Sequence, residues 1–213
     1  MIRAYDKTYL SRAQTTLGRM LDFAVHDLGY GLTNFFALFL QSGVASGVER
    51  GDPDTTVGKS GVELAYEVLE RCGVYHERVK VNYSADRSEE YWTGWALAYY
   101  QWYSARVFSD IVEVTPIEEI EAMYAPYHEM DIRQFVDRMN ELYRKAYPDT
   151  RLKTLRKRAG ISQRELAELS GVPLRTIQQY EQRQKNINKA QAEYLAQLSQ
   201  ALCCNMTELL ESS

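Results

Sequence analysis

Residues 160–183 read GISQRELAELSGVPLRTIQQYEQR, a pattern typical of two short helices joined by a tight turn. Ser162 and Glu165 have the types and spacing of a capping box, so we expect a helix to begin at Gln163. Gly171 can adopt the positive φ that ends a helix and turns the chain. We therefore expect the first helix to end there.

The second helix of the pair is expected to run from about Pro173 to Arg183. Proline suits the first turn of a helix because its missing N–H is not needed there. The side chains predicted to be buried are Val172, Ile177 and Tyr180. The side chains predicted to point elsewhere are Leu174, Arg175, Gln178, Gln179 and Gln182. Arginine and glutamine have the donor geometry that reads guanine and adenine edges in the major groove of DNA.

Residues 150–210 resemble the lambda-repressor-like (XRE) helix-turn-helix family. The matching positions are Gln163, Leu166, Ala167, Gly171, Val172 and Ile177. The resemblance implies a five-helix domain, completed by helices expected at 150–159 and 188–202 and a last turn at 205–210. The family often has glycine directly after the recognition helix, whereas this chain has Arg183 and Gln184. The geometry of the following loop is therefore left open.

The resemblance also implies a site for double-stranded DNA. The base-reading candidates are Gln163, Leu174, Arg175, Thr176 and Gln179. The phosphate-binding candidates are Arg164, Arg183, Lys185, Asn186 and Lys189. Arg156 and Glu181 match the positions of a partly buried ion pair that ties the recognition helix to the first helix. Motifs of this kind usually bind as dimers to two half-sites, so we expect a homodimer.

The net charge of −4 hides two oppositely charged parts. Residues 151–213 hold ten Lys and Arg against six Asp and Glu, a charge of +4, whereas the preceding residues hold fifteen against twenty-three, a charge of −8. Phosphate binding requires a positive surface, and an acidic surface would be repelled by DNA. We therefore expect the acidic part to face away from DNA.

An all-α protein with two domains is expected, an acidic helical domain at 1–146 and a DNA-binding domain at 147–213. The linker 147–150 is short and not rich in Gly or Ser, which favours a limited range of domain orientations. Apolar periodicity and caps predict helices at 6–28, 32–41, 61–72, 88–108, 115–124 and 131–146. The helix at 32–41 is apolar nearly all round, residues 43–54 suggest a short helix or turn, and residues 79–83, ending at Tyr83, suggest an extended loop.

Residues 88–108, SEEYWTGWALAYYQWYSARVF, are unusually aromatic. The candidates for a ligand or partner surface are Tyr91, Trp92, Trp95, Tyr99 and Trp102. Their rings would stack on bases, line a pocket for a peptide or small molecule, or pack in the core. The acidic surroundings disfavour base stacking, and core packing is the leading interpretation.

Catalytic and metal-binding motifs are missing from the sequence. The histidines, His26, His76 and His128, are far apart, and no P-loop, GxGxxG or GxSxG motif occurs. We interpret Cys72, Cys203 and Cys204 as partly buried apolar residues. We expect no enzyme, no metal and no cofactor. The polar start and the short apolar runs predict neither a signal peptide nor a membrane segment, hence a cytoplasmic protein.

Three functions remain open at this point. The preferred hypothesis is a sequence-specific transcriptional regulator whose acidic domain supplies dimerisation or sensing. The second is an antitoxin, in which the acidic domain binds a toxin partner and the helix-turn-helix represses its own operon. The third is a regulator that senses a peptide or small effector through the aromatic helix.

Overall fold

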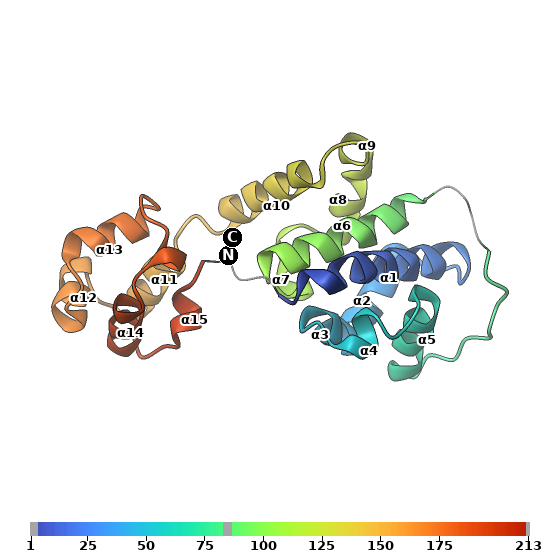
Figure 1. Ribbon diagram of the computed structural model, residues 1–213, viewed down its shortest axis with the longest axis horizontal. Helices are drawn as coiled ribbons and strands as arrows, with labels where there is room; N and C mark the ends of the chain where they lie inside the picture. Colours follow the sequence, from blue (N-terminus) through green and yellow to red (C-terminus); the bar gives the residue numbers. More distant parts are fainter. Residues whose placement is uncertain (1–3, 83–86, 212–213) are drawn as a thin grey trace. The chain divides into compact units, whose positions relative to one another are not determined.

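The computed structural model describes residues 4–82 and 87–211, and every regular element in those ranges is a helix (Figure 1). This confirms the all-α prediction. The chain separates into two compact units, residues 2–143 and residues 144–213. Tyr83 lies outside the described residues. No helix in the described ranges is both long and apolar enough to span a bilayer.

Among the described residues, the N-terminal unit holds nine complete helices and most of a tenth, α10, which continues past the end of the unit at residue 143. They are α1 Lys7–His26, α2 Leu32–Gln41, α3 Val44–Glu49, α4 Pro53–Thr56, α5 Gly61–Arg71, α6 Glu89–Ser104, α7 Phe108–Val114, α8 Ile117–Ala122, α9 Tyr124–Tyr127 and α10 Ile132–Ala146. Asp6 and Ser88 cap α1 and α6 through their side chains. Ser60 and Glu63 form the expected capping box on α5.

Helices α1 and α6 lie against each other and form the centre of this unit (Figure 1). Their backbones approach closely at two glycines, Gly18 and Gly94. A β-carbon at position 94 would lie 2.5 Å from the Leu17 carbonyl oxygen, and one at position 18 would lie 2.7 Å from the Tyr91 carbonyl oxygen. Glycine at these two positions therefore allows the crossing.

The aromatic residues of α6 are mainly part of the core. Trp92 and Trp102 are buried, with 9% and 6% of their surface exposed, so the proposal that they line an open surface is wrong. Trp92 packs edge-on against Tyr124 and Phe135, and Trp102 Nε1 donates to the Tyr5 carbonyl oxygen at 2.8 Å. The predicted surface reduces to the half-buried rings of Tyr91, Trp95 and Tyr99.

Three other details of this unit differ from expectation. Helix α2 is apolar nearly all round in sequence, yet Ala37 is exposed and only one side carries buried phenylalanines. Helix α7 was not predicted; it forms because Phe108 and Ile111 enter the core. Helix α9 is a further single turn after α8, where one longer helix was expected. Residues 74–82 form no regular element.

Up to residue 211, the last one described, the C-terminal unit contains the five α-helices that the resemblance implied. They are α11 Arg151–Arg158, α12 Gln163–Ser170, α13 Leu174–Glu181, α14 Ala192–Ala201 and α15 Met206–Leu209, with a short 3₁₀ helix, η1, at Ile187–Lys189. Its small core is formed by Leu152, Leu166, Val172, Ile177, Tyr180, Ile187, Leu198 and Leu209. These buried residues position α12 and α13 relative to each other.

The ends of this unit correct several predictions. Helix α14 begins at Ala192, because Asn188 is engaged elsewhere. The Asn188 amide accepts from the Glu211 backbone N–H at 2.8 Å and donates to the Glu211 carbonyl oxygen at 2.5 Å. Met206, at the start of α15 in the expected last turn, is 45% exposed. Cys203 is exposed as well, contrary to the expectation of partial burial.

Candidate nucleic-acid interface

The turn between α12 and α13 is built from local signals. The Ser162 hydroxyl accepts from the Glu165 backbone N–H at 3.2 Å, and the Ser162 backbone N–H donates to Glu165 Oε2 at 2.6 Å. The hydrogen bonds that the Glu165 carboxylate accepts from Ser162, chiefly from its backbone N–H, hold the pKa of Glu165 below its usual range. Gly171 ends α12 with a φ of 73°. Pro173 is the N-cap of α13 rather than its first residue, so the helix begins at Leu174, one residue later than expected.

Helix α13 has one buried and one open side. Ile177, Tyr180 and Glu181 are buried, whereas Arg175 is exposed and Gln179 is half-exposed. Leu174, Thr176 and Gln178 are also only partly buried. Within the described part of the chain, the Arg175 and Gln179 side chains have no hydrogen-bond or ion-pair partner. The open side of α13 therefore presents a guanidinium and side-chain amides to solvent.

Arg156 of α11 and Glu181 of α13 form a two-pronged ion pair. Arg156 Nε lies 2.7 Å from Glu181 Oε1, and Arg156 Nη2 lies 2.9 Å from Glu181 Oε2. The Glu181 side chain is 1% exposed and that of Arg156 is 12% exposed. The carboxylate raises the pKa of Arg156, chiefly by accepting its hydrogen bonds. The remaining Arg156 nitrogen, Nη1, donates to the Ile161 carbonyl oxygen at 2.8 Å.

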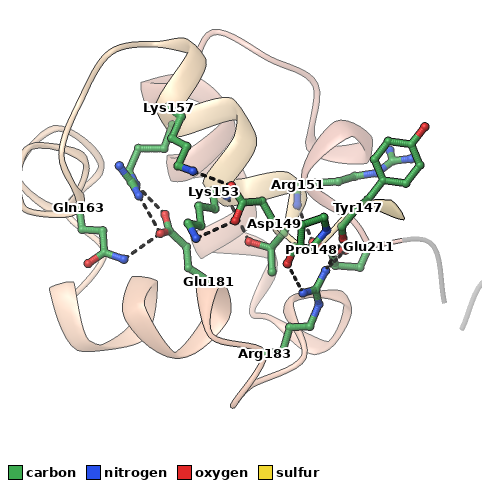
Figure 2. A network of polar contacts seen from close by, with 12 residues as sticks. Tyr147, Pro148, Asp149, Arg151, Lys153, Lys157, Gln163, Glu181, Arg183 and Glu211 are labelled. Atoms are coloured by element: carbon green, nitrogen blue, oxygen red, sulfur yellow. Dashed lines mark hydrogen bonds and ion pairs between the residues drawn. The ribbon is translucent and has the colours of Figure 1, made fainter. Parts of the chain in front are cut away.

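Gln163, at the first position of α12, joins this ion pair. Its Nε2 donates to Glu181 Oε2 at 2.7 Å, and the side chain is half-buried (Figure 2). The predicted base-reading residue is thus held by a contact to the last residue of α13. Arg175 and Gln179 have no such tie within the described residues.

Arg183 occupies the position where the family often has glycine, and it adopts the left-handed backbone conformation with a φ of 56°. Its Nη1 donates to the Pro148 carbonyl oxygen at 2.7 Å, and Nη2 lies 3.5 Å from the Tyr147 carbonyl oxygen (Figure 2). Nη2 also lies 3.9 Å from Glu211 Oε2. The guanidinium expected on phosphate is therefore engaged with the linker and the C-terminal segment.

The other predicted phosphate residues are exposed. Lys185 and Lys189 have no ion-pair partner in the described part of the chain, and neither has Arg164. Asn186 uses its side-chain oxygen to accept from the Asn188 backbone N–H at 2.9 Å, which caps η1. The lysine ammonium groups near η1 are therefore open to solvent anions.

Asp149 in the linker is a charged contact that the sequence reading missed. Its two carboxylate oxygens lie 2.7 Å from Lys153 Nζ and 2.6 Å from Lys157 Nζ (Figure 2). The hydrogen bonds from the two lysines lower the pKa of Asp149 to about 2. The spacing of Asp149 and Lys153, four residues apart, was the available signal. Asp149 therefore holds the linker against α11.

The described residues contain no group of three or more His, Cys, Asp or Glu side chains placed to hold a metal ion. The three cysteines are free thiols. The features that remain as a candidate site are the open side of α13, the start of α12 and the basic loop at η1.

Comparison with known proteins identifies part of the chain. Residues 152–209 match the model of a helix-turn-helix family, of the XRE-like type. The C-terminal part is therefore a helix-turn-helix domain, with α12 and α13 as its helical pair. No curated protein and no solved structure matches the chain.

Proposed function

We propose that this protein is a transcriptional regulator that binds duplex DNA sequence-specifically through α13. The observation that carries the proposal is the open side of α13. There Arg175 is exposed, Gln179 is half-exposed, and neither side chain has a partner among the described residues, while Ile177 and Tyr180 anchor the opposite side. Arginine pairs with guanine O6 and N7, and glutamine pairs with adenine N6 and N7. The exposed Lys185 and Lys189 of the basic loop at η1 would contact the DNA phosphates.

Electrostatics supports the same assignment. Residues 144–213 contain twelve Lys and Arg against seven Asp and Glu, a charge of +5, whereas residues 1–143 contain thirteen against twenty-two, a charge of −9. A positive domain gains affinity for DNA by releasing counterions from the phosphates. The proposal places the protein in the cytoplasm with the DNA and requires no catalysis.

The test is selection of bound duplexes from a random pool with the full chain, followed by affinity measurements on the enriched site. Arg175→Ala and Gln179→Ala are each expected to cost about 1–3 kcal/mol on that site and to relax the preference at one base pair. Gln200→Ala, an exposed residue on α14, is the matched control. Affinity of both recognition-helix variants equal to that of the parent at the same salt concentration would contradict the proposal.

The N-terminal unit is proposed to supply dimerisation and to bind a partner or effector. Its charge of −9 favours a basic protein partner, as in an antitoxin that sequesters a toxin and represses its own operon. A homodimer is expected because two half-sites are the usual target of such motifs. Sedimentation of the purified chain tests the dimer, and co-purification of a basic protein encoded beside it tests the partner. Loss of that co-purification in 0.5 M salt would accord with a charge-driven contact.

A further inference from the structure

A glutamine side chain has two faces with opposite hydrogen-bonding character. The carbonyl oxygen accepts, and the amino group donates two hydrogen bonds. A free glutamine can turn its amide by half a rotation and exchange these faces, so it can meet adenine or guanine. A glutamine with a fixed amide orientation is more selective.

Glu181 fixes the orientation of the Gln163 amide. Both carboxylate oxygens of Glu181 already accept from the Arg156 guanidinium, at 2.7 and 2.9 Å, and the side chain is 1% exposed. A carboxylate paired in this way only accepts hydrogen bonds. The group of Gln163 that faces it, 2.7 Å from Oε2, must therefore be the amino group. Figure 2 shows the amide oxygen of Gln163 on the side away from Glu181.

Reversal of this amide is strongly disfavoured. It would bring the carbonyl oxygen of Gln163 against a buried carboxylate and would remove one of the three hydrogen bonds that Glu181 accepts from the described residues. Gln163 therefore keeps its carbonyl oxygen and one remaining N–H for other partners. One acceptor beside one donor is the complement of the adenine edge, which offers the N6 amine and the N7 acceptor. Guanine offers two acceptors, O6 and N7, and would require both N–H groups.

We propose that Glu181 is a positioning residue that turns the carbonyl oxygen of Gln163 toward DNA and so makes Gln163 select a base with an exocyclic amine, adenine in particular. The inference rests on the proposed DNA binding. It adds two residues outside the open side of α13 as determinants of specificity: Gln163 at the start of α12 and the buried Glu181. It links specificity at the start of α12 to an ion pair between α11 and α13.

The first experiment compares base preferences of full-length variants by selection from the random duplex pool. The parent is expected to require an amine-bearing base at one position that Gln163→Ala no longer distinguishes. Glu181→Gln replaces the carboxylate by an amide that can present either its oxygen or its nitrogen, so Gln163 is released to turn. This variant is expected to lose the preference at that one position and to keep the preferences set by Arg175 and Gln179. Gln200→Ala is the control and should match the parent.

A general structural role of Glu181 would lower affinity for every sequence alike, so a change confined to one position separates positioning from stability. An unchanged preference in folded Glu181→Gln would overturn the proposal. So would a Gln163→Ala variant with the same preferences as the parent. If the parent enriches no sequence at all, the proposed function itself fails, which is a different result.

A second measurement needs no Glu181 variant, in case that variant does not fold. The adenine at the identified position is replaced by unsubstituted purine, which lacks only the N6 amine, in the enriched duplex. The parent is expected to lose about tenfold in affinity, because the Gln163 carbonyl oxygen then has no donor. Gln163→Ala should bind both duplexes equally. Equal binding of both duplexes by the parent would overturn the inference.

Discussion

Arg183, two residues after the last residue of α13, donates from Nη1 to the carbonyl oxygen of Pro148 at 2.7 Å and does so from a left-handed backbone conformation. A left-handed conformation is unfavourable for a residue with a β-carbon, so glycine is the usual choice there. In this chain Arg183 adopts that unfavourable conformation, and its guanidinium contacts the linker carbonyl oxygens of Pro148 and Tyr147. The loop after α13 and the linker are thus joined within one unit.

Substitution of Arg183 separates the backbone effect from the side-chain effect. Arg183→Ala and Arg183→Gly both lose the contacts to Pro148 and Tyr147, but only glycine relieves the left-handed strain. The glycine variant is expected to be more stable than the alanine variant by about 1 kcal/mol. All three tryptophans lie in residues 1–143, so tryptophan fluorescence reports unfolding of the N-terminal unit. Far-ultraviolet circular dichroism reports the loss of helix in both units. A change in circular dichroism without a change in fluorescence therefore measures unfolding of the C-terminal unit. Equal stability of the two variants would argue against strain at this position.

The exposed lysines of the loop at η1 are expected to act on phosphates without regard to base sequence. Lys185→Ala and Lys189→Ala should each weaken binding to specific and random duplexes by the same factor. Each should also reduce the slope of log affinity against log salt by about 1. Titrations at four salt concentrations measure the slope. A loss restricted to the enriched sequence would instead assign the lysine to base recognition.

The carboxylate of Asp149 gives the C-terminal unit an acid-sensitive contact. Its pKa is lowered to about 2 by the hydrogen bonds from Lys153 and Lys157, so the folded state favours the ionised form. The stabilisation is complete above the unfolded pKa of about 4 and disappears as the pH falls to about 2. Asp149→Asn should therefore be less stable than the parent at pH 7, and the difference should vanish near pH 2.

Urea unfolding of the full chain at pH 7, 5, 4, 3 and 2, followed by circular dichroism, measures this difference. Comparison of the two chains cancels the titration of the other carboxyl groups. A constant difference over the whole range would mean that the side-chain shape, rather than its charge, is responsible.

The crossing of α1 and α6 depends on the absence of a side chain at Gly94. Gly94→Ala would bring a β-carbon to 2.5 Å from the Leu17 carbonyl oxygen, an atom of the backbone that cannot turn aside. We expect the free energy of unfolding of the N-terminal unit to fall by about 1–3 kcal/mol or more. Tryptophan fluorescence in urea reports this unit selectively. Gly31→Ala, where the nearest atom beyond its neighbours is a side-chain nitrogen at 3.8 Å, is the control and should cost less than about 1 kcal/mol.

Local signals in the sequence were sufficient for the helical pair. Two local features form as predicted: the capping box of Ser162 and Glu165, and the left-handed Gly171 that ends α12. Each involves only groups within four residues of one another along the chain. The burial of Ile177 and Tyr180, three residues apart on α13, follows from the helical period alone, which predicts the open side of α13 as well. Such features depend on backbone geometry that is repeated in every helix.

The same reasoning failed where two or more elements share one side chain. For Trp92 and Trp102 the helical period leaves both core packing and an open surface as alternatives, and only the neighbours that pack around α6 on more than one side decide that both rings are buried. A helix is expected to begin at Asn188, but in the fold the Asn188 side chain donates to the Glu211 carbonyl oxygen and accepts from the Glu211 backbone N–H.

The sequence by itself determined that the C-terminal part forms a helix-turn-helix domain, because caps, turns and helical period are chemistry between near neighbours. Only the tertiary structure decided what the polar side chains do there. Gln163 is held by Glu181 and Arg183 by Pro148, residues 18 and 35 positions away. Hydrogen-bond partners are set by distances of about 3 Å in space, and only the folding of α11, α12 and α13 against one core brings such distant groups together.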